Sequence, residues 1–273
     1  LDFIIFKILI FFFGYLQMTS IANSFDFITY KEYCAKENMA IDETLFTSVK
    51  SGLRNSVFRI YGWDKPSITI GYFQKSENIN MSKCFENQIP IIRRMTGGRA
   101  VYHHHEITCS FFFKLDKFNY SKKLIFSAIS NIILNGLSSI GLSGSISHKT
   151  MGEAKNPNCF QTTSVCEIVN KNGIKLVGSA MLIKDNVVMM QSSIPLSNTN
   201  ENLIYFLNDF ANKDHKNYLN LNQKPDEKII DQFIYGIGKG VILNPLELTY
   251  TEKKLSDNLN KTKYSMDWWN FGR

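Results

Sequence analysis

The segment IPIIRRMTGGRAVYHHHEITCSFFFKL, residues 89–115, constrains the fold more than any other part of the chain. An apolar run leads into Arg93 and Arg94, two adjacent glycines follow, and a second extended run continues into β-branched and aromatic residues. Such residues favour strands, and adjacent glycines between extended runs favour a turn. We therefore expect a mixed or antiparallel sheet built around Gly97 and Gly98.

Further strands are predicted on both sides of this segment. Residues 56–63 and 67–73 have strand composition and are joined by turn residues. Residues 173–196 predict a hairpin in which Asp185 and Asn186 form the turn.

Helices are predicted between these strands. Apolar residues recur at helical spacing in residues 37–53 and 121–140, and each segment predicts an amphipathic helix. A third helix is expected after Pro225, and a fourth begins at a capping box formed by Thr249 and Glu252. The positions of the first helix that we expect in the core are Met39, Ile41, Leu45 and Val49.

The composition of the chain changes near residue 200, where it becomes polar and rich in asparagine. We expect a main domain over residues 18–200 and a small helical extension, residues 201–273, that packs on it. Residues 1–17 are apolar, but Lys7 interrupts them and they fall short of the roughly 20 residues of a membrane-spanning helix. A signal peptide would also have a basic start. We expect this segment to precede the true start at Met18, with a membrane anchor as the alternative.

The overall composition limits the possible partners and location. The chain has 273 residues, of which 44% are hydrophobic and 20% charged, as in a globular protein with a sizeable core. Its formal charge of +7 favours acidic partners. The basic residues are scattered and no nucleic-acid-binding motif occurs, so we do not expect nucleic acid as a partner. Five cysteines without a CxxC pair favour a cytoplasmic protein over a secreted, disulfide-linked one.

The glycine pair can form an anion or carbonyl site. Adjacent glycines let the backbone come close to a ligand, exposed N–H groups bind oxygen atoms, and arginines on both sides add positive charge. The segment is not a P-loop, because no Gly-Lys-Ser/Thr follows and the next residues are extended. An ordinary hairpin turn with solvated arginines is an equal alternative from spacing alone.

The triplet His103-His104-His105 does not predict a metal site. Only alternate residues of a strand share a face, so His103 and His105 could bind a metal together while His104 could not. No further His or Cys follows at ligand spacing. We expect no metal, and we assign only His103 to a pocket.

Two cysteines and one lysine are candidates for reactive groups. Cys159 follows Asn-Pro-Asn, where a thiolate could be approached, whereas Cys166 lies in an alternating segment as one more residue of a strand. Most free cysteines are buried and inert, so the residues alone leave both interpretations open. Lys175, close to Gly178, could reach into a pocket and bind an oxyanion, or it could lie at the surface with its charge in water.

Taken together, these motifs resemble the lipoate/octanoate protein ligase and transferase family, which shares its fold with biotin protein ligases. The resemblance covers nearly all of residues 35–273. It implies an α/β fold with a large mixed sheet flanked by helices, a smaller sheet, and an acyl chain in a tunnel between them; residues 18–200 would then be the catalytic domain. The motifs that carry it are NMAIDETL (38–45), GYFQ (71–74), RRMTGGRAVYHHHEITCSF (93–111), NCF (158–160), GIKLVGSA (173–180) and KYSMDWWNF (263–271).

The resemblance also implies roles for individual residues. Cys159 lies 16 residues before Lys175, the spacing at which a cysteine-dependent branch of the family carries its nucleophile. Cys159 and Lys175 are therefore the expected catalytic residues. The residues expected to bind the acyl substrate are Arg93, Arg94, Thr96, Gly97, Gly98, Arg99, Ala100, His103, Gly178, Ser179 and Ala180.

Two activities share this pattern. The cysteine-dependent branch needs no cofactor and moves octanoate from acyl carrier protein to a lysine of glycine-cleavage H protein or another lipoyl domain. ATP-dependent lipoate ligases instead activate free lipoate as an adenylate and need ATP and magnesium. The carboxy-terminal residues and the NCF motif favour the transferase. A non-catalytic lipoyl-domain binding protein and a biotin ligase are weaker alternatives, and the usual glycine-arginine loop of biotin ligases is absent from the sequence.

Overall fold

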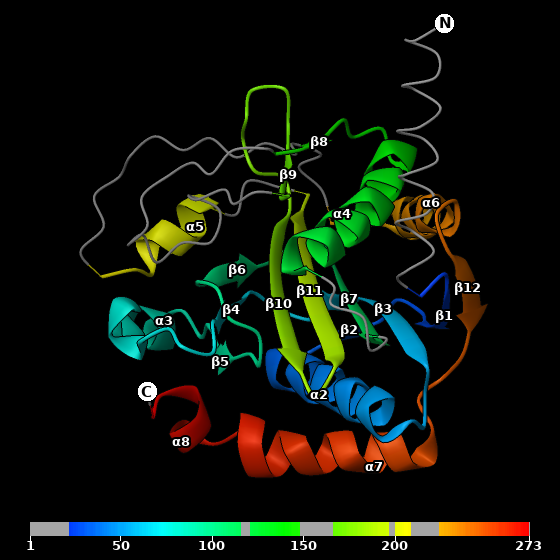
Figure 1. Cartoon of the computed structure of the whole chain (residues 1–273). Helices are drawn as coiled ribbons and strands as arrows, with labels where there is room; N and C mark the ends of the chain where they lie inside the picture. Colours follow the sequence, from blue (N-terminus) through cyan, green and yellow to red (C-terminus); the bar gives the residue numbers. More distant parts are fainter. Residues whose placement is uncertain (1–21, 116–120, 148–165, 197–199, 209–223, 273) are drawn as a thin grey trace, which may run out of the picture.

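The computed structural model describes residues 22–115, 121–147, 166–196, 200–208 and 224–272. A large mixed sheet runs through the middle of these residues, with strand order β10-β11-β7-β3-β1-β12 and with β2 paired to β3 (Figure 1). The strands of this sheet are β1 (Ser24–Ile28), β2 (Glu32–Tyr33), β3 (Ser56–Trp63), β7 (Glu106–Lys114), β10 (Gly178–Lys184), β11 (Val187–Pro195) and β12 (Ile242–Pro245).

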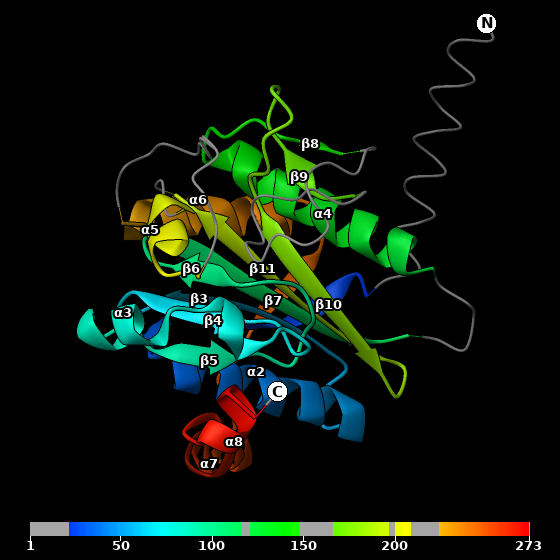
Figure 2. The same cartoon turned by 90° about the vertical axis from the view of Figure 1, so that its left-hand side faces the viewer.

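Helices cover both faces of the large sheet (Figure 2). On one face lies α2 (Ala35–Ser51), and α7 (Tyr250–Leu259) packs on the outside of α2. On the other face α4 (Lys122–Ser139) packs against α6 (Glu227–Gly238). The predicted core positions Met39, Ile41, Leu45 and Val49 of α2 are all buried. The mixed α/β class and both long helices predicted from apolar spacing are confirmed.

The predicted hairpin at residues 185–186 is also confirmed. β10 and β11 pair antiparallel, and Lys184 lies opposite Val187. Asp185 and Asn186, at φ 53° and 59°, are both in the left-handed region, as a two-residue turn between twisted strands requires.

A second, smaller sheet lies beside the large one and has the order β5-β4-β6. Its strands are β4 (Ser67–Ile70), β5 (Ile91–Arg93) and β6 (Val101–His103). β5 pairs parallel with β4 and β6 pairs antiparallel with it, so β5 and β6 do not pair with each other. The alternative of an ordinary hairpin turn at Gly97-Gly98 is therefore wrong: the glycines lie in a connection that crosses from one edge of β4 to the other.

The carboxy-terminal part is built into the main body of the fold. β12 adds to the edge of the large sheet in parallel with β1, so the expected helical extension also contains a strand. The capping box of α7 is present, since Thr249 Oγ1 accepts from Glu252 N and the Glu252 carboxylate accepts from Thr249 N. The other short elements are η1 (Ser76–Asn78), α3 (Met81–Glu86), β8 (Ser145–Ile146), β9 (Ile168–Val169), α5 (Asn200–Tyr205), η3 (Asn260–Tyr264) and α8 (Asp267–Asn270).

Cys166 and the apolar amino-terminal segment were the subject of two further expectations. Cys166 is not in a strand: it adopts a left-handed φ of 75° in the turn before β9, so its description as a strand residue is wrong. The apolar residues 1–17 lie outside the described residues. Among the helices that are described, none combines the length and apolar character needed to cross a membrane.

Candidate active site

The α2 face of the large sheet changes from apolar to polar along its strands. Val57, Phe112 and Met189 form an apolar row across β3, β7 and β11. The next row on this face is Arg59, Ser110 and Gln191, and the one after is Tyr61, Thr108 and Ser193. All six of these side chains are buried. A buried polar stripe needs internal partners, and it forms the floor of a pocket beneath the small sheet.

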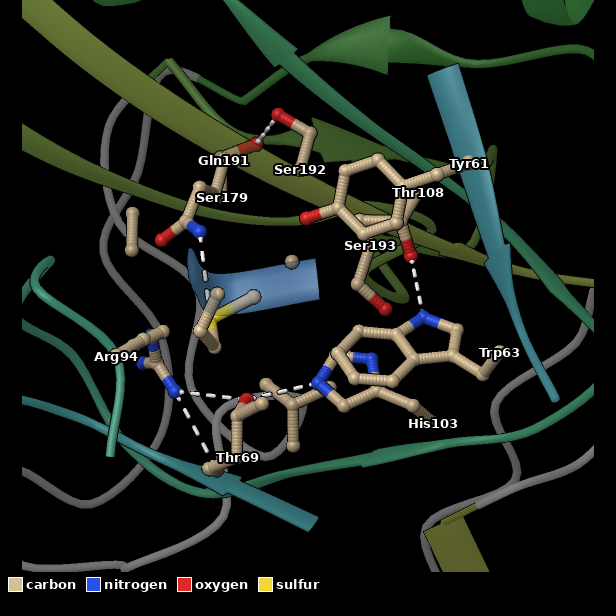
Figure 3. Close-up of a pocket in the computed structure, with 14 residues that line it drawn as sticks. Tyr61, Trp63, Thr69, Arg94, His103, Thr108, Ser179, Gln191, Ser192 and Ser193 are labelled. Carbon is tan, nitrogen blue, oxygen red and sulfur yellow. Dashed lines mark hydrogen bonds between the residues drawn. The ribbon is translucent and has the colours of Figure 1, made fainter. Parts of the chain in front are cut away.

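The pocket lies between the two sheets and is open to solvent on one side (Figure 3). Its walls combine apolar and aromatic side chains with polar side chains from both sheets. The lining residues are Met39, Tyr61, Trp63, Thr69, Arg94, Val101, His103, Thr108, Gly178, Ser179, Ala180, Gln191, Ser192 and Ser193.

The glycine loop is the connection between β5 and β6, residues 94–100, and Arg94 holds it from inside. Its Nη2 donates to the carbonyl oxygens of Gly97 and Arg99, each at 2.8 Å, and its Nε donates to Thr96 Oγ1 at 3.1 Å. Nη1 reaches across to the backbone and hydroxyl oxygens of Thr69 on β4, at 3.3 and 3.2 Å. The guanidinium is buried, so these bonds fix the shape of the loop where it borders the pocket.

Close backbone contact explains the glycines on either side of this loop. Gly98 has φ 90°, which favours glycine. A Cβ on Gly71 would come within 2.0 Å of the Gly98 carbonyl oxygen, so the 71–74 segment can lie this close to the loop only with glycine at position 71. Ala100, which follows the loop, is completely buried.

Arg93 points away from the pocket. Its guanidinium donates to the carbonyl oxygens of Gly71, Tyr72 and Gln74, at 2.6 to 3.1 Å, and to those of Trp269 and Asn270 at 3.0 Å. The structure therefore places Arg93 as a clamp between the 71–74 segment and α8. It does not bring Arg93 to the residues that line the pocket.

A buried hydrogen-bond chain ties the glycine loop to α2. Asp42 accepts from Arg59 Nη1 at 2.6 Å, from Tyr61 OH at 3.0 Å and from Gln191 Nε2 at 2.7 Å. Because Asp42 fixes its amide orientation, Gln191 presents Oε1 to the Thr96 hydroxyl at 2.7 Å. The loop that carries Arg94 is thus positioned by a carboxylate on a helix behind the sheet.

His103 is the member of the histidine triplet that lines the pocket. Its Nδ1 lies 2.9 Å from Glu106 Oε1 and its Nε2 lies 2.7 Å from Thr69 Oγ1. Its ring stacks on Trp63 with centroids 3.9 Å apart. His104 and His105 stack on each other instead and lie outside this pocket. Among the described residues no group of three metal-binding side chains occurs.

The first residues of β10 form one side of the pocket. Gly178, Ser179 and Ala180 line it, and the hydroxyl of Ser179 lies 2.9 Å from that of Ser192 on β11. Lys175, just upstream, is buried and its Nζ donates to Glu167 Oε1 at 2.7 Å. Lys175 is therefore held in an ion pair inside the protein, and the alternative of a surface lysine with its charge in water is wrong.

The described cysteines are not set up as nucleophiles. Burial raises the pKa of Cys84 to about 11, and burial also raises the pKa values of Cys34, Cys109 and Cys166. A raised pKa leaves less of the reactive thiolate at neutral pH. Cys159, the expected nucleophile, lies outside the described residues.

The sequence prediction missed Thr69, Glu106 and Gln191 as parts of this site. One signal was available: in β7 the polar residues Glu106, Thr108 and Ser110 alternate with apolar ones inside a strongly apolar strand. Such alternation in a strand buried on both faces indicates a polar stripe with internal partners.

Comparison with known proteins agrees with this arrangement. A model of the lipoyl protein ligase A/B catalytic domain matches residues 34–229. Octanoyltransferase LipM of Bacillus cereus is 33% identical over 259 residues, covering 86% of this chain and 93% of that protein. Octanoyltransferase LipM of Carboxydothermus hydrogenoformans is 28% identical and covers 90% of this chain and 97% of that protein.

Solved structures show the same fold. A bi-partite lipoate protein ligase from Thermoplasma acidophilum superposes with a TM-score of 0.74 at 20% identity, over 91% of this chain and 96% of that one. Lipoate-protein ligase A bound with ATP gives a TM-score of 0.73 at 21% identity, over 92% and 99% of the two chains. With a family model that matches most of its length, and with relatives at one-third identity, the chain belongs to the lipoyl protein ligase A/B family.

Proposed function

We propose that this chain is an octanoyltransferase, which takes an octanoyl group from acyl carrier protein and attaches it to a lysine of glycine-cleavage H protein or another lipoyl domain. The observation that carries the proposal is the similarity to octanoyltransferase LipM of Bacillus cereus along 93% of the length of that protein. The pocket between the two sheets supports it, since it is bordered by apolar and aromatic side chains and by small residues of β10.

The pocket residues bind the acyl group in this proposal. Arg94, His103, Gly178, Ser179 and Ala180 contact the octanoyl chain or its carbonyl, while Thr96, Gly97, Gly98, Arg99 and Ala100 shape the loop above it. Burying the methylenes of an octanoyl chain, at roughly 0.8 kcal/mol each, contributes about 5 kcal/mol to affinity. Arg93 acts indirectly, by holding the 71–74 segment in place.

The reaction takes place in two acyl transfers. The Cys159 thiolate attacks the carbonyl carbon of the donor thioester; a new C–S bond forms, the old C–S bond breaks, and the donor leaves as a thiol. A lysine amine of the acceptor then attacks the new thioester and releases Cys159. A cation near a thiol favours the thiolate, and we assign this role to Lys175. Lys175 and the backbone N–H groups near Gly97 and Gly98 stabilise the oxyanion.

Both proteins that exchange the acyl group would be recognised partly by charge. The formal charge of the chain is +7, and acidic carrier domains are attracted to such a surface before docking. The thioester is already activated, so the transfer needs no cofactor.

The test is an intact-mass measurement. The purified protein is incubated with octanoyl acyl carrier protein without ATP, and we expect the mass of one octanoyl group to be added to the wild type but not to Cys159→Ser. Addition of apo H protein should then remove this mass from the enzyme and place it on the acceptor.

A lipoate ligase is the second candidate, because the two ligase structures share the fold. It predicts the opposite pattern: octanoate or lipoate reaches the acceptor only with ATP and magnesium, and Cys159→Ser keeps that activity. A protein inert under both conditions would instead be a non-catalytic binder of lipoyl domains.

A further inference from the structure

Arg94, Thr69 and His103 form a hydrogen-bond chain along one wall of the pocket (Figure 3), and the chain continues behind His103 to Glu106. Arg94 Nη1 lies 3.2 Å from Thr69 Oγ1, and Thr69 Oγ1 lies 2.7 Å from His103 Nε2. On the other side of the imidazole, His103 Nδ1 lies 2.9 Å from Glu106 Oε1. The chain runs from Arg94, just after β5, through Thr69 on β4 and His103 on β6 to Glu106 on β7, so both sheets contribute to it.

All the bonds of this chain can run in one direction, from Arg94 to Glu106. A guanidinium can only donate and an ionised carboxylate can only accept. Because Arg94 donates to Thr69 Oγ1, the Thr69 hydroxyl has its own hydrogen free to donate to His103 Nε2. The imidazole completes this direction when its Nδ1–H donates to Glu106 and its Nε2 accepts from Thr69, which places the basic nitrogen of His103 toward Thr69.

Glu106 is held firmly enough to orient His103. Its Oε1 also accepts from Trp63 Nε1 at 3.1 Å and from the Thr108 hydroxyl, and its Oε2 accepts from Ser193 Oγ at 2.8 Å. The Glu106 side chain is completely buried, and Trp63 stacks on the imidazole of His103. A base 2.7 Å from a hydroxyl and oriented by a buried carboxylate has the geometry of a catalytic triad.

Thr69 provides the link to a ligand in the pocket. Its hydroxyl has two lone pairs, one of which is used by Arg94, and one hydrogen, which goes to His103. The second lone pair can accept a hydrogen bond from a group in the pocket that Thr69 lines. Thr69 Oγ1 can accept a proton from such a group while the Thr69 hydroxyl proton passes to His103 Nε2.

We propose that Thr69, His103 and Glu106 form a proton relay that deprotonates the amine receiving the acyl group. The proposal rests on the proposed function, acyl transfer to a lysine. Thr69 touches the amine, His103 stores the proton, and Glu106 is a positioning residue that acts through His103.

The acyl transfer to the amine needs such a base. A lysine has a pKa near 10.4, so only about one in 2,500 is a free amine at pH 7. In the relay one ammonium proton passes to Thr69 Oγ1 while the Thr69 hydroxyl proton passes to His103 Nε2. The amine lone pair then attacks the acyl carbon; the C–N bond forms, the C–S bond breaks, and the departing thiolate takes the second nitrogen proton.

Among the residues that the structure describes, the other groups that line the pocket do not compete for this proton. The titratable or charged side chains that line this pocket with His103 are Arg94, from the segment after β5, and Tyr61 from β3, with Glu106 behind the imidazole. Burial raises the pKa of Tyr61 well above its usual value, so Tyr61 stays a phenol. α2, β10 and β11 contribute only uncharged side chains to the lining.

The decisive experiment compares two acceptors for a preloaded octanoyl-enzyme. Lysine of apo H protein needs a base, whereas hydroxylamine is a neutral nucleophile at pH 7 and does not. Thr69→Val removes the hydroxyl and keeps the shape, and Arg94 retains its bonds to Thr96, Gly97 and Arg99. We expect transfer to lysine to fall about 100-fold or more while transfer to hydroxylamine changes little. Thr69→Ser should restore lysine transfer. The exposed Thr47→Val is the matched control.

Each outcome has a distinct meaning. Equal loss toward both acceptors, or no loss toward lysine, overturns the relay while the proposed function stands. A wild type that forms no octanoyl-enzyme and acylates no acceptor overturns the proposed function and the relay with it. A second measurement does not depend on activity: nitrogen NMR of His103 at pH 7 should show the Nδ1–H tautomer, and an Nε2–H tautomer contradicts the relay.

Discussion

At the scale of single residues, the two neighbouring arginines have opposite roles. Arg94 borders the pocket and holds the glycine loop, whereas Arg93 donates to five backbone carbonyls that belong to the 71–74 segment and α8. Alternation along a strand end sends adjacent side chains to opposite sides, which is why a motif that contains both does not give both the same function.

Arg93→Lys should therefore destabilise the protein and leave the chemistry largely intact. A lysine has one compact donor group and cannot satisfy carbonyls on two segments, so we expect the free energy of unfolding to fall by about 3 kcal/mol or more. Urea unfolding measures this change. An unchanged unfolding midpoint together with a raised KM for the acyl donor would place Arg93 in substrate binding instead.

Gln191→Leu tests the link between α2 and the glycine loop. The change leaves Thr96 Oγ1 without its acceptor and removes one donor from Asp42, which keeps Arg59, Tyr61 and Ser110. A buried polar group without a partner costs about 1–3 kcal/mol, and we expect a loss of that size in urea unfolding. The acyl-transfer rate, measured well below the unfolding transition, should also fall because Thr96 no longer fixes Arg94. A rate equal to that of the wild type would show that the loop keeps its shape without Gln191.

At the scale of elements, the periodicity of the sequence predicted features that lie within one segment. It did not predict which strands pair when they are far apart in the sequence. The α2 positions, the β10–β11 turn and the α7 capping box follow from spacing within one segment, and the structure has them where the sequence predicted them. The pairing of β5 and β6 on either side of β4, and the addition of β12 to the large sheet, bring together segments separated in the sequence. No local pattern in a single sequence specifies such partners.

The crossing of α4 and α6 gives a prediction at this scale. A Cβ on Gly236 would lie 2.4 Å from the Asn135 carbonyl oxygen and 2.7 Å from Gly136 Cα, so the two helices are in backbone contact. Alanine favours a helix by about 1 kcal/mol over glycine, but the backbone cannot yield without separating the helices.

Gly236→Ala should therefore lower the free energy of unfolding by about 1–3 kcal/mol despite the better helix propensity. The control is Gly238→Ala on the same helix, where a Cβ would meet nothing within 4 Å and where we expect no loss. Thermal or urea unfolding of both variants decides the point, and equal effects at the two positions would show that helix contact is not the cause.

At the scale of the whole molecule, the site could be predicted in part. The resemblance led to Arg94, His103 and the Gly178–Ala180 segment, which do line one pocket. Thr69, Glu106 and Gln191 could not be assigned, because each is an ordinary strand residue until the two sheets face each other. Their place at the site comes from the packing of the small sheet against the large one, which depends on the whole fold.

The same long-range assembly joins the two ends of the described chain. Arg54, two residues before β3, donates through Nε and Nη2 to the Glu252 carboxylate, each at 2.7 Å, and through Nη1 to Asp26 on β1 at 3.2 Å. Glu252 belongs to α7, so one buried guanidinium connects an amino-terminal strand with a carboxy-terminal helix. Both side chains of the Arg54–Glu252 pair are almost completely buried.

This ion pair predicts how stability depends on pH. Burial alone would raise the pKa of Glu252, but hydrogen bonds from Arg54, Thr249 and Ser48 lower it from 4.5 to about 2. The unfolded chain therefore binds a proton more readily than the folded one as the pH falls from 4.5 toward 2. The pair contributes its full stability above pH 4.5 and loses it through this window, and a shift of this size corresponds to roughly 3 kcal/mol.

Glu252→Gln should lower the free energy of unfolding at pH 7 by about 2–3 kcal/mol, and the difference from the wild type should shrink as the pH is lowered below 4. Urea unfolding at a series of pH values measures both quantities. The matched control is Asp185→Asn, which removes one charge of the exposed Lys50–Asp185 pair and keeps a residue suited to the left-handed turn. Because solvent screens that pair, the control should stay close to the wild type at every pH. A Glu252→Gln deficit that is the same at pH 3 and pH 7 would mean that the helix cap, and not the charge of Glu252, joins α7 to the sheet.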